Sequence, residues 1–209
     1  EAQGGSKYGD GGFIEVSGKE NLIYRGYITA SAENGEPGQV LFDPLNITIS
    51  NTGADSLDSN KAFSENPGTD ATFSPTTITT TLKDGTPLTL QANQDITITD
   101  AISVTADSAG NGGALTLSAG GSIAINNDIT TDGGAFTATA NTSGYDTGNP
   151  PSGTASLTLA AGADITTNGG NVTLTIYAPG LTVGNTTING TITTNNGNVF
   201  ITNEGADNN

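Results

Sequence analysis

The side chains that could take part in acid–base or metal chemistry in this chain are almost all carboxylates. Its 209 residues include 21 Asp and Glu, five Lys and Arg, and no His or Cys. Without His or Cys, the chain can form no serine or cysteine triad, no histidine base and no Cys/His zinc site. The Asp pairs stand in turn contexts and not on a strand face beside a basic clamp, and Lys61 and Lys83 have polar, loop-like surroundings. We therefore predict no catalytic residue, no cofactor-binding residue and no metal site, and we expect that the protein is not an enzyme.

Two of the aspartates open a repeated motif, so the first question is whether the repeat serves chemistry or shape. The motif is "DITTDGG" at residues 128–134 and "DITTNGG" at 164–170, with a weaker copy, "TITTNNG", at 191–197. Stacked aspartates would be natural calcium ligands, and weak calcium binding is the alternative interpretation. The glycine-rich nonapeptide of calcium-binding β-rolls is absent, however. We favour shape, with Ile129 above Ile165 in a core and Gly134 and Gly170 turning the chain.

The elements that carry these motifs read as very short β-strands. Branched apolar residues alternate with Thr or small residues, as in "LTL" at 88–90, "IAI" at 123–125 and "VTLTI" at 172–176. Turns rich in Gly, Asn and Asp separate them, and no segment shows helical spacing over three turns. Only 33% of the residues are hydrophobic, so a wide core cannot form. These features predict an all-β parallel β-helix, a solenoid of stacked coils with surface loop insertions.

Composition divides the predicted solenoid into three parts. Residues 1–49 are expected to form N-terminal coils with richer packing. Residues 50–75 are polar, lack alternation and are expected to form a surface loop insertion. Residues 76–209 are expected to form repetitive coils, interrupted by a second loop at residues 141–153.

Three segments of this chain are similar to a series found in the filamentous haemagglutinin and high-molecular-weight adhesin family. They are "GGFIEVSGKENL" at 11–22, "GYITASAENGEPGQVLFDPLNITI" at 26–49 and "TTITTTLKDGTPLTLQANQDITITDAI" at 76–102. The resemblance covers about residues 10–105, and beyond it the chain is similar to the family only as generic repeats. It implies a right-handed parallel β-helix, exported through an outer-membrane transporter by two-partner secretion. It also implies an extracellular or cell-surface location on a Gram-negative bacterium and adhesion to a host or neighbouring cell surface or glycan.

The net charge of the chain limits the classes of partner that it can bind. The formal charge of −16 repels nucleic acid and anionic lipid head groups, and no apolar stretch is long enough for membrane insertion. Five Asn-x-Ser/Thr sequons are candidates for glycosylation. They stand at Asn46, Asn141, Asn171, Asn185 and Asn189.

Three further hypotheses concern the solenoid as a whole. Both of its ends are expected to be equally uncapped, which predicts self-association through the β-helix ends, head to tail, into filaments. A carbohydrate-active β-helix enzyme, a lyase or glycoside hydrolase working with paired carboxylates, is the alternative function. Ice binding by Thr-x-Thr patterns, such as Thr137 with Thr139, would require the pattern on nearly every coil, and we expect it to be missing at Leu115 and Leu157.

Overall fold

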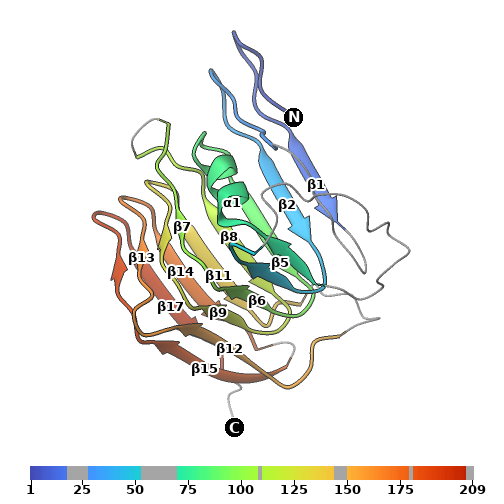
Figure 1. Cartoon of the computed structure of the whole chain (residues 1–209), viewed down its shortest axis with the longest axis vertical. Coiled ribbons are helices and arrows are strands. Elements are labelled where there is room, and N and C mark those ends of the chain that lie inside the picture. Colours follow the sequence, from blue (N-terminus) through green and yellow to red (C-terminus); the bar gives the residue numbers. More distant parts are fainter. Residues whose placement is uncertain (18–27, 53–69, 108–109, 144–149, 179–180, 206–209) are drawn as a thin grey trace.

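The computed structural model describes residues 1–17, 28–52, 70–107, 110–143, 150–178 and 181–205. In this part of the chain it is mostly β, with three parallel sheets and one short helix (Figure 1). We call the sheets A, B and C. In order across each sheet, the strands of A are β1 (Phe13–Ser17), β2 (Gln39–Asp43), β5 (Leu88–Ala92), β8 (Leu115–Ala119), β11 (Phe136–Ala140), β14 (Val172–Ile176) and β17 (Val199–Asn203).

The two other sheets contain six and four strands, and those of sheet C have only two residues each. Sheet B contains, in order, β15 (Thr182–Ile188), β12 (Thr154–Leu159), β9 (Ile123–Ile125), β6 (Ile96–Ile98), β3 (Ile47–Ile49) and β4 (Ala71–Phe73). Sheet C contains β16 (Ile192–Thr193), β13 (Ile165–Thr166), β10 (Ile129–Thr130) and β7 (Ile102–Ser103). From β5 to β17 the chain visits A, B and C in fixed rotation. Each return adds a parallel strand beside the one laid down in the preceding circuit.

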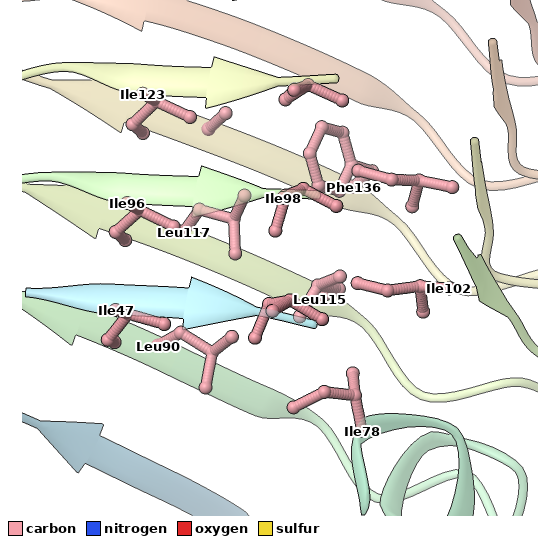
Figure 2. Packing of buried hydrophobic residues seen from close by; sticks show 14 of the residues in the cluster. Ile47, Ile78, Leu90, Ile96, Ile98, Ile102, Leu115, Leu117, Ile123 and Phe136 are labelled. Atoms are coloured by element: carbon pink, nitrogen blue, oxygen red, sulfur yellow. The ribbon is translucent and has the colours of Figure 1, made fainter. Parts of the chain in front are cut away.

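The core consists of apolar columns that run across the strands. Alternation places every second side chain inside, and the parallel register puts like residues opposite one another. Ile129 is paired with Ile102 on one side and with Ile165 on the other, and all three are completely buried. The predicted stacking of Ile129 and Ile165 is therefore confirmed. Figure 2 shows similar columns, including Ile47, Ile96 and Ile123 of sheet B.

One helix interrupts the strands, and the sequence analysis missed it. Helix α1 (Pro75–Leu82) begins at Ser74, whose side chain accepts a hydrogen bond from the Thr76 backbone N–H, and Pro75 fills the first turn. Ile78 and Leu82 lie one turn apart and are fully buried. Figure 2 shows Ile78 beneath Ile102 of β7, where it extends the core on that side. The threonines between them favour strands, but the cap and these two buried side chains favour the helix.

The predicted loop at residues 50–75 is also too long at its C-terminal end. Residues 71–73 form strand β4, which pairs in parallel with β3, and Ala71 and Phe73 are buried. The Phe73 ring packs against Phe42, with ring centroids 4.9 Å apart. Residues 53–69 of that loop, and residues 144–149 of the second predicted loop, lie outside the described residues.

The repeated motif turns the chain at the corner before the next strand, and its left-handed residues stand directly before Gly134 and Gly170. The left-handed residues are Asp132 and Gly133 in the first copy, with φ of 50° and 105°, and Asn168 and Gly169 in the second, with φ of 52° and 128°. Gly134 and Gly170 follow these residues at the bend that leads into the next strand, as predicted, although neither has a positive φ. They are glycines because the backbone of the neighbouring circuit comes very close.

These close approaches form a column of glycines at the edge where sheet A begins. A methyl group on Gly134 would overlap the carbonyl oxygen of Gly113, and one on Gly170 would overlap that of Gly134. Gly197 is placed in the same way against Gly170. The column contains one larger residue, since the carbonyl group that faces Gly113 belongs to Thr86.

Candidate functional site

A polar groove of about 560 Å³ is the candidate site in the described residues. One wall comes from the segment before β2, with Ala32, Glu33 and Pro37. The other walls come from the residues after α1, the loop between β7 and β8, and the turn before β11. Those walls contain Lys83, Asp84, Gly85, Asp107, Gly110, Asn111, Gly112 and Gly133. Figure 1 shows the segments before β1 and β2 running out beyond the sheets as two long arms.

The loop between β7 and β8 is tied to the end of α1 by backbone hydrogen bonds. The Asp107 N–H donates to the Lys83 carbonyl oxygen at 2.8 Å, and the Gly113 N–H donates to that of Leu82 at 2.7 Å. These bonds satisfy carbonyl groups that the last turn of a helix leaves without partners. The end of the helix therefore fixes one wall of the groove.

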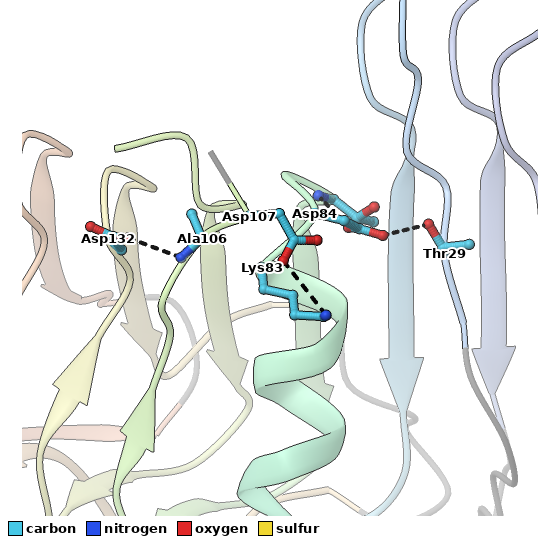
Figure 3. A network of polar contacts seen from close by, with 7 residues as sticks. Thr29, Lys83, Asp84, Ala106, Asp107 and Asp132 are labelled. Atoms are coloured by element: carbon cyan, nitrogen blue, oxygen red, sulfur yellow. Dashed lines mark hydrogen bonds and ion pairs between the residues drawn. The ribbon is translucent and has the colours of Figure 1, made fainter. Parts of the chain in front are cut away.

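The charged groups of the groove hold one another and the backbone in place (Figure 3). Asp84 accepts a hydrogen bond from the Thr29 hydroxyl at 2.8 Å through one oxygen and from the Thr86 N–H at 3.1 Å through the other. The Lys83 ammonium lies 3.6 Å from the Asp107 carboxylate. The groove is therefore acidic, with Glu33, Asp84 and Asp107 against a single lysine.

The groove lies where the glycine column is interrupted. Thr86 stands between Gly38 and Gly113 in the register of sheet A, and its hydroxyl is buried without a hydrogen-bond partner among the described residues. A threonine side chain at this position needs more room on the side of the arm before β2 than a glycine would need. The sequence analysis did not identify this site. The sequence feature that could have revealed the groove is Thr86, which stands two residues before β5. The later strands of sheet A have a glycine at that position.

The geometry of the groove suits reversible contact with polar groups better than bond cleavage. Both oxygens of Asp84 accept hydrogen bonds from the protein, and Asp107 is half of an exposed ion pair. Glycine backbone lines much of the remaining surface. Such a surface can hydrogen-bond to hydroxyl and amide groups of a partner.

The stacked aspartates of the repeated motif accept hydrogen bonds from backbone N–H groups. Oδ1 of Asp128 accepts the Asp164 N–H at 2.9 Å, and Oδ1 of Asp164 accepts the Thr191 N–H at 2.8 Å. Each carboxylate thus ties its own circuit to the next. No three acidic side chains come together as a possible metal site in the part of the chain that the structure describes.

The sequons differ sharply in accessibility. Asn141 is completely buried with φ of 59°. Its amide nitrogen donates to the carbonyl oxygens of Tyr177 at 2.6 Å and Leu181 at 3.1 Å, and its amide oxygen accepts the Leu181 N–H at 2.7 Å. A glycan on that nitrogen is incompatible with this arrangement.

The other four sequons are more accessible. Asn46 is partly buried, and its amide nitrogen donates to Asp70 at 2.6 Å. Asn171 is exposed, and its amide oxygen accepts the Asn198 N–H at 2.8 Å. Asn185 lies within β15, the outer strand of sheet B, Asn189 follows that strand directly, and both are exposed. These two are the best placed to carry a glycan.

Threonine columns lie on the outer faces of all three sheets, and in sheet B the column is interrupted by Ala124. In sheet A, Thr89, Thr116, Thr137 and Thr173 stand in register. The full Thr-x-Thr pattern is missing beside Leu115 and Leu157, as expected, because Ser118 and Ser156 take the place of the second threonine. Sheet C carries a similar column of Thr130, Thr166 and Thr193. A pattern on every face is typical of the β propensity of Thr and singles out no ice-binding surface.

Comparison with known proteins assigns no family to this chain. No family model matches the chain, and no curated protein matches it. Among the described residues, no helix is long and apolar enough to cross a membrane, and α1 has only eight residues.

Proposed function

We propose that the three sheets are the faces of a right-handed parallel β-helix, and that the chain is a structural and adhesive segment of a filamentous-haemagglutinin-like protein. The observation that carries this proposal is the fixed rotation of the chain through sheets A, B and C, with side chains stacked in register. A right-handed path agrees with the strong preference of parallel crossover connections. Each circuit adds one strand spacing of about 4.8 Å to the length of a rod.

The adhesive part of the proposal depends on the surface that such a rod presents. Stacked circuits form a rigid support, and binding residues in proteins are often placed on loops held by such a support. The polar groove beside α1 and the segments inserted between strands are the irregular parts of this surface. We propose that they contact a glycan or another cell-surface component.

The same proposal places the protein outside the cell. In this view an outer-membrane transporter exports it, and it is secreted or displayed on the outer surface of a Gram-negative bacterium. Support comes from the sequence resemblance over residues 10–105. The charge of −16 agrees with a solvated outer surface that does not bind nucleic acid.

Two measurements test the proposal. Small-angle X-ray scattering of the purified chain should give the cross-section and length of a short rod. Beads coated with the folded protein should bind cells more strongly than beads coated with heat-unfolded protein, and removal of surface glycans should weaken the binding. A compact, nearly spherical particle would contradict the β-helix.

A groove variant gives the binding test a control. Asp107→Lys inverts the charge at the exposed wall of the groove and is expected to reduce bead binding several-fold. Asp164→Asn, outside the groove, keeps the acceptor oxygen for Thr191 and should leave binding unchanged. Equal binding by both variants would remove the groove from the proposal. Release of reducing sugar from a polysaccharide would instead favour the carbohydrate-active alternative.

A further inference from the structure

Acidic side chains gather around the polar groove. Three carboxylates face one ammonium group in its lining, a net charge of −2, and these residues are Glu33, Asp84, Asp107 and Lys83. Asp132 adds another carboxylate directly before the lining residue Gly133, and Figure 3 shows it along the same edge of the sheets as Asp107 and Asp84. A cleft that carries one sign of charge concentrates ligands of the opposite sign.

A buried hydroxyl without a partner lies between two walls of the groove. Thr86 is completely buried, and its Oγ1 has no hydrogen-bond partner among the described residues. In the glycine column a methyl group points at the neighbouring circuit, as one on Gly134 would point at Gly113. In the same register the Thr86 side chain extends towards Gly38, which follows Pro37 in the arm before β2. An unpartnered buried hydroxyl lowers stability, and such exceptions in native proteins require an explanation.

Two carboxylates of the groove can accept a new partner. Glu33 is exposed, and no hydrogen bond or ion pair joins its side chain to the described residues. Asp107 and Lys83 are 63% and 41% exposed and lie 3.6 Å apart, so solvent weakens their attraction and another cation can replace the lysine. Because Glu33 and Asp107 belong to different walls, a cation that enters the groove meets carboxylates on both.

The rest of the lining favours a polyhydroxylated ligand over a peptide. Glycine backbone and the Asn111 amide can form hydrogen bonds with hydroxyl groups. The apolar side chains are only Ala32 and Pro37 among the described lining residues, so the apolar residues of a peptide find little to pack against. No aromatic ring in this lining offers a stacking surface for a neutral sugar. The negative charge repels sugars that carry carboxylates.

We propose that the groove binds an amino sugar, a polyhydroxylated ligand that carries ammonium groups. The inference rests on the glycan contact proposed above and names the class of glycan. Ammonium groups of the ligand pair with Glu33 and Asp107, and a sugar hydroxyl that parts the two walls gives Thr86 its missing partner. No three acidic side chains converge in the described residues, so separate ammonium groups fit them better than one metal ion.

Three oligosaccharides of equal length test the charge of the ligand. They are a glucosamine oligomer, its N-acetylated form and a glucuronic acid oligomer, titrated calorimetrically at a pH that keeps the amino groups protonated. The glucosamine oligomer should bind about tenfold more tightly than the acetylated form, because it alone forms charge-assisted hydrogen bonds. Glucuronic acid should not bind, and added salt should weaken the binding of glucosamine.

Substitutions that remove a single charge test the position of the site. Glu33→Gln and Asp107→Asn each remove one negative charge from a different wall, and each should weaken glucosamine binding about fivefold or more. Both side chains are exposed, so the variants should fold. Asp164→Asn is the matched control, because it removes the same charge outside the groove and keeps the acceptor oxygen for Thr191. Its affinity for glucosamine should be unchanged.

Thr86→Val distinguishes a contact with the ligand from a structural role. Valine keeps the shape of threonine and removes the unpartnered buried hydroxyl, so the melting temperature should rise by about 2–4 °C. The same variant should bind glucosamine several-fold more weakly, because the ligand loses a hydrogen bond. A gain in stability with unchanged affinity would contradict the contact with Thr86.

Three results would overturn the inference as a whole. They are equal or tighter binding of the acetylated oligomer, glucosamine affinity that survives both Glu33→Gln and Asp107→Asn, and equally tight binding of oligolysine, which would indicate attraction of any polycation. Coated beads that bind cells, from a chain without affinity for glucosamine, would contradict this inference and leave the proposed function intact. Glucosamine binding by a chain whose beads bind no cells would contradict the proposed function alone.

Discussion

Each position of the repeated motif has its own structural task. Asp128 ties its circuit to the next by accepting a backbone N–H, and Ile129 fills a core column. The buried Thr131 hydroxyl donates to the Gly134 carbonyl oxygen, and Asp132 adopts the left-handed conformation that Asp and Asn tolerate. Thr167 repeats the first of these bonds, donating to Gly170 at 2.5 Å. The repeated residues therefore build the same turn in each circuit.

At the same scale, the buried Asn141 holds two segments together. Asn141→Ala should lower the free energy of unfolding by about 3 kcal/mol, because it removes three hydrogen bonds and leaves Ala in a left-handed conformation. Urea denaturation measures the change. Asn185→Ala, at an exposed sequon, is the matched control and should change stability by less than about 0.5 kcal/mol. Similar losses in both variants would contradict the role assigned to Asn141.

Asp43 gives a prediction about pH. Burial, together with the nearby Glu15 carboxylate, raises the pKa of Asp43 above its usual value of 3.8. The folded state thus binds this proton more tightly than the unfolded state, so stability falls as pH rises above about 3.8 towards the raised pKa. At pH values above the raised pKa, the full loss of stability from the ionised Asp43 remains.

Asp43→Asn should therefore stabilise the protein at pH 7 and make little difference at pH 3. Thermal unfolding across this pH range measures the effect. Glu15→Gln should give a smaller gain in the same direction, because it removes the repulsion and leaves the burial. A variant equally stabilised at pH 3 and pH 7 would show that the gain does not come from titration of Asp43.

At the scale of elements, the glycine column sets the distance between circuits. Gly134→Ala should destabilise the protein by about 3 kcal/mol, since its methyl group would overlap the Gly113 carbonyl oxygen and the backbone has little room to move. Gly205→Ala, with open space around it, should be nearly neutral. Gly153→Ala, with φ of 91° and no close neighbour, should cost about 1–2 kcal/mol through conformation alone. Chemical denaturation of the three variants would contradict the overlap argument if Gly134→Ala were the least affected.

Helix α1 shows how a short element can decide the architecture around it. It takes its place beside β7, covers that edge of sheet C and fixes one wall of the polar groove. On the same side, the outer strand of sheet B is β4, which pairs with β3.

At the scale of the whole molecule, the net charge of −16 should oppose folding through self-repulsion. We expect the melting temperature at pH 7 to rise when salt increases from about 0.01 to 0.15 M, because the screening length falls from about 30 to 8 Å. At pH 4.1, near the isoelectric point, the same change should have little effect. Equal salt effects at both pH values would contradict net repulsion as the cause.

The sequence by itself determined the features that depend on local alternation and turn chemistry. Period-2 patterns predicted short strands with one buried face, and the identical spacing of Ile129 and Ile165 in their motifs predicted their stacking. The lack of His and Cys excluded whole classes of catalytic site. These conclusions needed only residue types and their order, because neighbours along one strand face opposite sides whatever surrounds them.

Only the tertiary structure decided the features that depend on contacts between distant residues. The burial of Asn141, the close approach at Gly134 and the groove beside Thr86 all arise from the neighbouring circuit, at least 20 residues away in the chain. Helix α1 could not be predicted from its threonine-rich sequence, because burial of Ile78 and Leu82 against the core outweighs the strand preference of the residues between them. Local pattern predicts which face of a strand is buried, whereas only packing determines what lies against that face.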